Sequence, residues 1–342
     1  MNFEQVINLN KDSKVYFFGA GGVFITAIQR HKEHLQKANI VGVFDNNASK
    51  WGQIIEGYEI LPLERINQCG EDDVIIITSS YVQEIKAQLQ PFGFKKIYAY
   101  HDLNHIGRMF TKEEVDKLNY MKTFLADDKS RMVVDKIIEK RQKGNSDFSD
   151  IYEPDQYFVE DIVSIDENTV FVDGGAYIGD TVQVLIQKSG NRFKKVYAFE
   201  PDAINYQKLV AAYAEDDRIV PINAGLGKCH QEMHFIVNET NSEGGRVAEE
   251  GGETIIIESI DECIKDKVSF IKLDVEGFEM DTLHGAEKTI KSYKPTLTIC
   301  LYHKAEDLYE IPSFIHSLVP EYKLYVRHHT KGVAETVLYA VM

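Results

Sequence analysis

The hydrophobic positions of the chain form two series in which short apolar runs alternate with amphipathic stretches. In the first series each apolar run predicts a β-strand. In the stretches between the runs, apolar residues recur three and four positions apart, which predicts helices. The strands are expected at residues 14–18, 40–44, 73–78 and 96–99, with helices up to about residue 37 and over residues 82–92. This alternation predicts a small Rossmann-like α/β domain, which we place at residues 1–105.

The pattern becomes purely helical after the first series. Apolar residues such as Val115, Leu118 and Met121 recur at spacings of three and four between about residues 111 and 143. No strand pattern interrupts them, and this periodicity is typical of helices that pack one face against a core. We therefore expect a helical connector over residues 106–154.

The second series is longer and occupies residues 155–342. A helix is expected over residues 280–292, and strands are expected at 170–172, 195–199, 219–223, 268–273, 296–301, 323–327 and 336–341. The last two are separated by a short polar segment that contains Gly332, so they can pair as a hairpin. The sequence thus predicts an α/β chain with two Rossmann-like domains, the second a mainly parallel sheet that ends in an antiparallel hairpin.

Composition and charge narrow the class of protein. The 342 residues exceed what one core comfortably fills, and 44% hydrophobic with 27% charged residues is typical of a folded protein. Asp and Glu outnumber Lys and Arg by 54 to 38, giving a formal charge of −16. Such a charge repels phosphate backbones, so nucleic acid is not an expected partner.

The cysteines and the amino terminus indicate the compartment. Cys69, Cys229, Cys263 and Cys300 lie far apart and form no CxxC pair, so neither a zinc site nor a disulfide framework is indicated. The polar amino terminus does not read as a signal peptide, and no apolar run approaches the roughly 20 residues that span a bilayer. We expect a cytoplasmic protein without membrane insertion.

The first domain carries an incomplete dinucleotide pattern. Gly19, Gly21 and Gly22 follow its first strand, but Phe24 stands where G-x-G-x-x-G requires glycine. Asp45 ends the second strand, where dinucleotide folds often place a ribose-binding acid. A structural or degenerate unit is favoured over a working nucleotide site. The stretch FDNNASKWG at 44–52 resembles the amino-terminal Rossmann-like domains of some sugar-modifying enzymes, which implies recognition of a sugar nucleotide or a carrier.

The second domain has a more complete set of ligand-binding positions. Asp173, Gly175 and Gly179 form a D-x-G-x-x-x-G turn, in which glycine permits positive φ and close backbone approach. Glu200 ends the next strand, where a carboxylate can bind both hydroxyls of a ribose. Asp274 and Glu276 end the fourth strand and Tyr302 and His303 the fifth, and the carboxyl ends of parallel strands share one sheet edge.

Four motifs make the second domain recognisable: VDGGAYIGDT at 172–181, YAFEPD at 197–202, FIKLDVEGFEMDTLHGAE at 270–287 and LYHKAEDLYEIP at 301–312. Residues 155–342 resemble the FkbM-type methyltransferases, which are class I enzymes that depend on S-adenosyl-L-methionine. Tyr177 stands where the general methyltransferase pattern prefers glycine, but the FkbM-type pattern does not require it. The resemblance implies that the cofactor contacts Asp173, Gly175, Tyr177, Gly179, Glu200, Asp202, Asn223 and Asp274.

Methyl transfer to a hydroxyl requires alignment of the reacting atoms and removal of a proton. His303 is the expected general base because imidazole titrates near neutral pH, and Asp274 is the expected second catalytic residue. A structural histidine that bonds to a loop backbone is the alternative. Asp274, Glu276 and His303 could instead hold a divalent cation, although a metal-free site is favoured.

The resulting hypothesis is an O-methyltransferase that acts on a hydroxyl of a sugar, glycan or related natural product, for example in polysaccharide biosynthesis. One alternative is a sugar-nucleotide-binding or scaffolding protein with a degenerate methyltransferase domain. Another is an NAD-dependent oxidoreductase that uses the first domain. The expected partner is a small-molecule or glycan acceptor, recognised through the polar segment 238–252 and the segment near Tyr157, and the sequence is compatible with a homo-oligomer.

Overall fold

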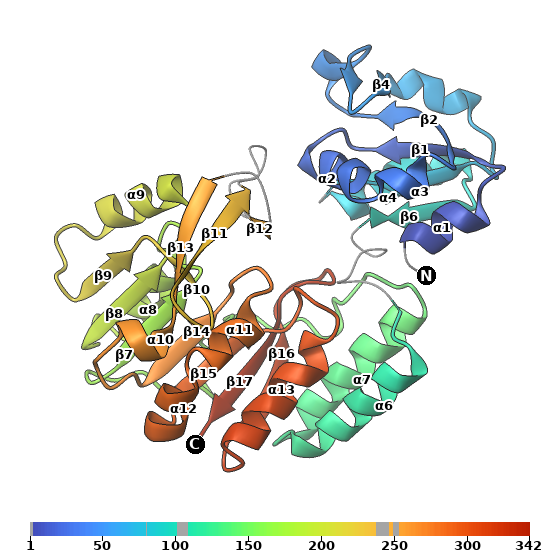
Figure 1. Cartoon of the computed structure of the whole chain (residues 1–342). Coiled ribbons are helices and arrows are strands. Elements are labelled where there is room, and N and C mark those ends of the chain that lie inside the picture. Colours follow the sequence, from blue (N-terminus) through green and yellow to red (C-terminus); the bar gives the residue numbers. More distant parts are fainter. Residues whose placement is uncertain (1–2, 80, 101–108, 237–245, 249–252) are drawn as a thin grey trace. The chain divides into compact units, whose positions relative to one another are not determined.

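The computed structural model describes residues 3–79, 81–100, 109–236, 246–248 and 253–342 of the chain (Figure 1). It divides into two compact units, of which the first ends at Met109 and the second begins at Phe110. Within these described residues, no helix combines the length and apolarity that crossing a membrane requires.

The first unit is built on a six-stranded sheet with the order β3-β4-β2-β1-β5-β6. Neighbouring strands are parallel except the β3–β4 pair. The strands are β1 (Lys14–Phe18), β2 (Asn39–Phe44), β3 (Ile54–Ile55), β4 (Tyr58–Leu61), β5 (Val74–Ile77) and β6 (Lys96–Ala99). The helices are α1 (Phe3–Leu9), α2 (Gly22–Arg30), α3 (Lys32–Leu35) and α4 (Val82–Leu89). The four predicted strands are confirmed, whereas α1, β3 and β4 were not predicted.

Alternation along β1 explains why this sheet has helices on both faces. Val15 and Phe17 contribute to one buried cluster, and Tyr16 and Phe18 contribute to the other. Phe24 is fully buried in the first cluster, where its ring packs edge-on against Phe17 at a centroid distance of 5.3 Å. The residue that interrupts the dinucleotide pattern is therefore a core residue.

The second unit is built on a seven-stranded sheet with the order β16-β17-β15-β14-β7-β8-β9. Its strands are β7 (Val170–Gly174), β8 (Lys195–Phe199), β9 (Ile219–Ile222), β14 (Phe270–Leu273), β15 (Thr296–Cys300), β16 (Lys323–His328) and β17 (Thr336–Val341). All neighbours are parallel except β17, which runs antiparallel to both β15 and β16. The predicted class of fold, a mainly parallel sheet with an antiparallel terminal hairpin, is confirmed.

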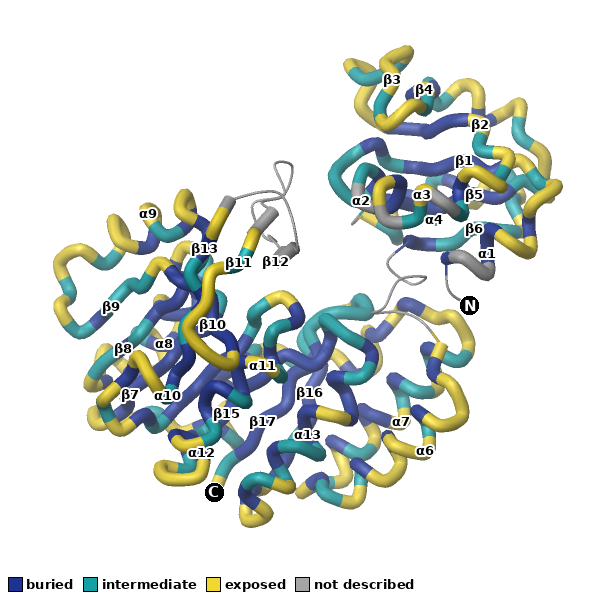
Figure 2. The backbone as a smooth tube through the Cα atoms, in the orientation of Figure 1, coloured by how far each residue is buried: buried dark blue, intermediate teal, exposed yellow. Residues whose placement is uncertain are grey.

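Helices cover this second sheet, and its strands are the most deeply buried part of the unit (Figure 2). The helices of the second unit are α6 (Lys112–Met121), α7 (Asp128–Gln142), α8 (Asp180–Lys188), α9 (Ala203–Ala212), α10 (Ile260–Cys263), α11 (Glu279–His284), α12 (Glu287–Tyr293) and α13 (Asp307–Leu318). Helix α6 begins at a capping box formed by Thr111 and Glu114. Because α6 packs on α13 and α7 packs on β16, both helices belong to the second unit (Figure 1).

Two features of the second unit differ from the sequence pattern. The single helix expected over residues 280–292 is divided into α11 and α12 around Gly285, where an added Cβ would lie 2.1 Å from the carbonyl oxygen of Gly227. A second sheet, with the order β10-β13-β11-β12, was not predicted. Its strands are β10 (Gly225–Leu226), β11 (Gln231–Ile236), β12 (Arg246–Ala248) and β13 (Glu253–Glu258). Apart from β12, the polar segment 238–252 lies outside the described residues.

Candidate active site

Four neighbouring strands bring ionisable residues to one edge of the seven-stranded sheet. Asp173 lies in β7, Glu200 follows β8, Asp274 follows β14 and His303 follows β15. These strands are adjacent and parallel in the order β15-β14-β7-β8, so their carboxyl ends share one edge. In open α/β sheets this edge is where ligands bind.

The turn after β7 has no room for a side chain at Gly175 or at Gly179. Gly175 has a φ of +75°, and an added Cβ would lie 1.9 Å from the carbonyl oxygen of Asp274. Gly179 has a φ of +89°, and a Cβ there would lie 2.3 Å from the ring of Tyr213. Tyr177 also adopts a left-handed conformation, with a φ of +48°. The turn therefore packs directly against the loop after β14 and against the helix after β8.

Glu200 is tied to this turn by its own carboxylate. Oε2 accepts a hydrogen bond from the backbone N–H of Tyr177 at 2.8 Å, and Oε1 accepts one from the N–H of Asp202 at 2.9 Å. Burial raises the pKa of Glu200 to about 7, although these two bonds act in the opposite direction. A carboxylate offers about four acceptor positions, so each oxygen can still accept a bond from a ligand hydroxyl.

Two other predicted contact residues hold the loop that carries Glu200. The side chain of Asp202 accepts a hydrogen bond from the N–H of Asn205 at 2.8 Å, which caps α9. Asn223 donates from Nδ2 to the carbonyl oxygen of Glu200 at 2.9 Å and to that of Pro201 at 3.1 Å. Both residues therefore lie beside Glu200 and fix its backbone.

Asp173 is paired with a lysine that was not among the predicted site residues. Lys272 Nζ lies 3.0 Å from Asp173 Oδ1, and both side chains are almost fully buried. The ammonium also donates to the carbonyl oxygens of Gly174 and Gly175, at 3.1 and 2.8 Å. Burial opposes the charge, but the carboxylates of Asp173 and Asp274 outweigh it and keep the pKa of Lys272 above its usual value. A lysine within the apolar run FIKL was the available sequence signal.

Asp274 receives a hydrogen bond from a tyrosine on each of its two oxygens. Tyr157 Oη donates to Oδ2 at 2.8 Å, and Tyr302 Oη donates to Oδ1 at 2.9 Å. Burial opposes ionisation, but the positive charges of Lys272 and His303 and the two hydroxyl bonds hold the pKa of Asp274 below its usual range. The carboxylate is therefore ionised and fixed in orientation.

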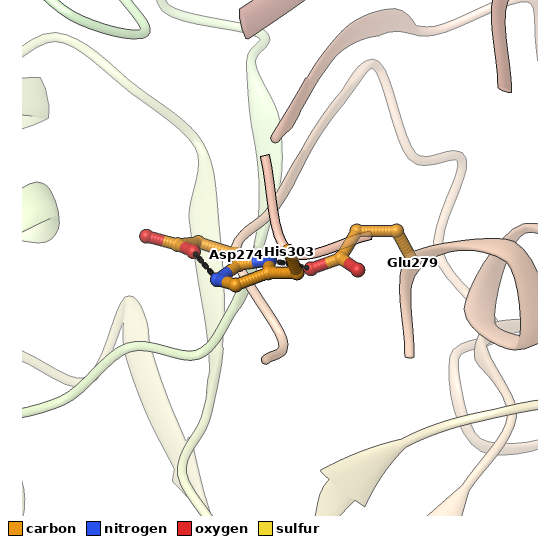
Figure 3. Close-up of side chains that lie close together, drawn as sticks. All are labelled: Asp274, Glu279 and His303. Carbon is orange, nitrogen blue, oxygen red and sulfur yellow. Dashed lines mark hydrogen bonds and ion pairs between the residues drawn. The ribbon is translucent and has the colours of Figure 1, made fainter. Parts of the chain in front are cut away.

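The imidazole of His303 lies between carboxylates (Figure 3). Nδ1 lies 2.8 Å from Glu279 Oε1, while Nε2 lies 3.4 Å from Asp274 Oδ1 and 3.6 Å from Glu276 Oε2. Burial alone would lower the pKa of His303, but Glu279, Asp274 and Glu276 outweigh burial and raise it to about 10. Nδ1 is hydrogen-bonded to Glu279, whereas Nε2 lies within ion-pair distance of Asp274 and Glu276, and the raised pKa makes the ring an imidazolium at neutral pH.

Asp274, Glu279 and His303 lie close enough together to be considered as a metal site, because one ligand atom of each lies within 4.8 Å of the others. The ring of His303 lies between two of these carboxylates and bridges them. Glu279 faces Nδ1 and Asp274 faces Nε2, so the two carboxylates address different nitrogens (Figure 3). A metal ion binds one nitrogen of a histidine, so a shared ion would require these side chains to rearrange.

Asp45, the candidate ribose-binding residue of the first unit, already has hydrogen-bond and ion-pair partners within the fold. Asp45 Oδ2 accepts from the N–H of Ala20 at 2.7 Å and lies 3.2 Å from Lys50 Nζ. Its Oδ1 accepts from the N–H of Asn47 at 2.8 Å. The carboxylate thus bonds to the glycine turn that a dinucleotide would approach.

These features define the class of protein when they are compared with known families. The family model of the FkbM methyltransferase domain matches residues 173–323, which contain Asp173, Glu200, Asp274 and His303. A second model, described as C2185-like, N-terminal, matches residues 11–98. The second unit is a methyltransferase domain. Residues 173–323 of this unit thus match the FkbM methyltransferase domain that the sequence motifs predicted.

Individual relatives are similar to parts of the chain. Hexuronic acid methyltransferase AglP of Haloferax volcanii is 28% identical over 136 residues, which are 37% of this chain and 54% of the relative. The redox-sensing transcriptional repressor Rex of Carboxydothermus hydrogenoformans is 29% identical over 100 residues, 27% of this chain and 47% of the repressor. The chain thus spans about half the length of these curated relatives.

A crystal structure with the same fold covers almost the whole chain. It is that of methyltransferase FkbM from Methylobacillus flagellatus KT, with a TM-score of 0.73 and 21% sequence identity. The match covers 98% of this chain and 92% of that protein. At this identity the likeness establishes the shared fold.

Proposed function

We propose that this chain is an S-adenosyl-L-methionine-dependent O-methyltransferase that acts on a hydroxyl of a sugar, glycan or related natural product. The observation that carries the proposal is the placement of Glu200 and Asp274 on either side of the Gly175 turn, at the edge where ligands bind. A carboxylate that can accept two more hydroxyl bonds lies on one side, and an ionised, oriented carboxylate lies on the other.

The chemistry of these donors fits the cofactor. Glu200 would hold the ribose hydroxyls, and Asp274 would face the positive end that carries the ammonium and the sulfonium. Asp173, Tyr177, Gly179, Asp202 and Asn223 would shape this pocket, the last two by holding the Glu200 loop. The cofactor supplies an already activated methyl group, so the protein has to align the acceptor oxygen and accept its proton.

His303 is the proposed general base, and its surroundings set a condition on that role. The imidazolium must lose a proton before it can accept one, and three carboxylates oppose that loss. A positive ligand group placed against Asp274 would weaken this opposition by neutralising one of the three. We therefore propose that His303 becomes a base only in the loaded enzyme, and that Asp274 couples the two events.

A second candidate function is methylation of a carboxylate on an acidic sugar. The observation that favours it is the placement of three carboxylates around the ring of His303, which favour its charged form, because a carboxylate acceptor has no proton to remove. The relative named hexuronic acid methyltransferase supports an acidic sugar as acceptor.

One assay separates these candidates. Methyl-labelled S-adenosylmethionine is incubated with the protein and either 4-nitrophenyl glucoside or 4-nitrophenyl glucuronide, which differ at C6. A base-stable labelled ether supports the hydroxyl acceptor, and a label released by mild alkali identifies an ester. If a panel of neutral and acidic sugars gives no labelled product, the enzymatic proposal is contradicted in favour of a scaffolding role.

We propose that transfer needs no metal ion, because the carboxylates around His303 address different ring nitrogens. Activity that survives exhaustive chelation is the expected result. Activity that is lost on chelation and restored by Mg²⁺ would contradict this part of the proposal.

For the first unit we propose recognition of a sugar nucleotide or of the carrier that presents the acceptor. A dinucleotide is disfavoured because Asp45 already bonds to Ala20 and Lys50. Stabilisation of the unit by uridine diphosphate sugars but not by NAD, measured by thermal shift, is expected. Stabilisation by NAD alone would contradict it.

A further inference from the structure

Tyr157 lies outside the part of the chain that matches the methyltransferase family model, yet it contacts the centre of the site. It belongs to the segment 152–160, which precedes β7. The backbone of this segment adopts left-handed conformations at Asp155 (φ +64°) and Tyr157 (φ +67°). Such conformations are unfavourable for residues other than glycine, so the surrounding contacts must hold them.

Those contacts fasten the segment at several points. The N–H of Glu153 donates to the carbonyl oxygen of His328 at 2.9 Å, and Asp155 forms an ion pair with Lys188 at 3.0 Å. The N–H of Tyr157 donates to Tyr339 Oη at 3.1 Å. The side chain of Tyr157 is 8% exposed, so it is directed into the domain and held there.

The side chain of Tyr157 contacts Asp274 directly and covers the lysine that pairs with Asp173. Its hydroxyl donates to Asp274 Oδ2 at 2.8 Å. Its ring centroid lies 5.2 Å from Lys272 Nζ, the ammonium of that ion pair. A cation over an aromatic face is attracted to it, and the ring also shields the ion pair from water.

We propose that Tyr157 is a positioning residue of the methyl-donor site, which orients Asp274 through its hydroxyl and covers the Lys272–Asp173 ion pair with its ring. This inference rests on the proposed function, because it assigns Tyr157 to the site that binds S-adenosylmethionine. It adds the segment 152–160 to a proposed site whose other residues all lie within residues 173–323, the part of the chain that matches the family model.

The Tyr157→Phe variant separates the two contacts, because phenylalanine keeps the ring over Lys272 and removes only the hydroxyl. Asp274 then loses one of the two hydroxyl donors that favour its ionised form, so its pKa rises. Affinity for a positively charged ligand should fall, and it should begin to fall at a higher pH than in the wild type. A residue that only packs the core would lower stability without moving this pH dependence.

The test is calorimetric titration of the full chain with S-adenosylhomocysteine, which keeps the ammonium, between pH 3 and pH 6. In this range Glu200 is mostly protonated, so the remaining change of affinity reports Asp274. We expect Tyr157→Phe to weaken binding by roughly 3- to 10-fold, as for the loss of one hydrogen bond. The acid limb of its binding profile should move to higher pH. Tyr302→Phe removes the other hydroxyl and should move the limb in the same direction. Tyr152→Phe is the matched control, because Tyr152 lies in the same segment and is 45% exposed.

The outcomes separate this inference from the proposed function. If the wild type does not bind S-adenosylhomocysteine, the proposed function fails and the inference fails with it. If the wild type binds and Tyr157→Phe binds equally well with an unchanged pH profile, only the inference is overturned. An equal loss of affinity in Tyr152→Phe would also overturn it. If Tyr157→Phe does not fold, an unchanged acid limb in Tyr302→Phe overturns the orienting role.

Discussion

The ring of His303 is anchored by Glu279, whose Oε1 lies 2.8 Å from Nδ1 and whose side chain is fully buried. Glu279 also accepts a hydrogen bond from the N–H of Val275 at 2.9 Å, so its own position is fixed. A buried carboxylate bound to one nitrogen sets the orientation of the ring and favours its charged form. The loop after β14 and the first turn of α11 thereby determine how readily the ring of His303 can lose a proton.

The first prediction concerns the pH dependence of the reaction. With a pKa raised to about 10, His303 in the free enzyme is charged below that pH. If it is the base, kcat/KM should rise with pH through the neutral range and continue to rise above pH 8. Glu279→Gln removes one opposing carboxylate with little change of shape and should move the rise to lower pH. A profile that is identical in both proteins would exclude His303 as the base.

The second prediction concerns Glu200. Glu200→Gln keeps the size of the side chain but removes the charge that would bind the ribose hydroxyls. Hydrogen bonds to charged groups contribute about 1.5–3 kcal/mol, so affinity for S-adenosylhomocysteine should fall by roughly 10- to 150-fold.

The wild-type protein offers a second test of the same residue. Burial raises the pKa of Glu200 to about 7, so its ionised form is lost as pH falls through that value. Affinity should therefore increase from pH 6 to pH 8 in the wild type, and this increase should be absent in Glu200→Gln. An unchanged affinity in the variant would mean that Glu200 does not contact the ligand.

The third prediction concerns the buried pair of Lys272 and Asp173. Lys272→Met leaves the Asp173 carboxylate buried without its partner, and removing one member of a buried pair costs about 3–5 kcal/mol of unfolding free energy. Adding Asp173→Asn should recover part of the loss. Denaturant unfolding followed by circular dichroism measures the effect.

The chain provides two controls for that experiment. Lys195 pairs with Asp266 at 3.3 Å at the surface, so Lys195→Met should cost at most about 1 kcal/mol. Trp51 is the only tryptophan in the sequence and lies in the first unit, so its fluorescence reports that unit separately. We expect Lys272→Met to lower the stability of the second unit alone. If tryptophan fluorescence shows that the first unit is destabilised by the same amount, this expectation is contradicted.

The strands and their ends could be predicted well because both depend on local patterns. Apolar runs that end in ionisable residues mark Asp173, Glu200, Asp274 and His303 in the sequence itself, and the strand order makes these residues neighbours. The terminal hairpin was equally visible from its two apolar runs.

The partners of these residues depend on contacts that local patterns do not encode. Tyr157 is 117 positions from the aspartate it binds, and nothing in its neighbourhood indicates that contact. Lys272 and Glu279 lay within the recognised motifs, but their partners Asp173 and His303 lie in other strands and loops. Asp45 fits a ribose-binding pattern in the sequence, whereas the fold commits its carboxylate to Ala20 and Lys50.

The fourth prediction concerns the turn after β7. Gly175→Ala would place a Cβ 1.9 Å from the carbonyl oxygen of Asp274, so the turn and the loop after β14 would have to separate. Binding of S-adenosylhomocysteine should be lost. Gly190→Ala is the control, because Gly190 also has a positive φ of +60° but no neighbouring atom within 4 Å of the added Cβ. It should cost roughly 1–2 kcal/mol of stability and leave affinity unchanged.

We infer that the edge formed by Gly175, Glu200 and Asp274 binds the methyl donor. Calorimetric titration of the wild-type chain with S-adenosylhomocysteine, with NAD as the comparison ligand, tests it most directly. We predict saturable binding of one S-adenosylhomocysteine per chain, with no heat of binding from NAD. Binding of NAD without binding of S-adenosylhomocysteine would show that this edge does not bind the methyl donor.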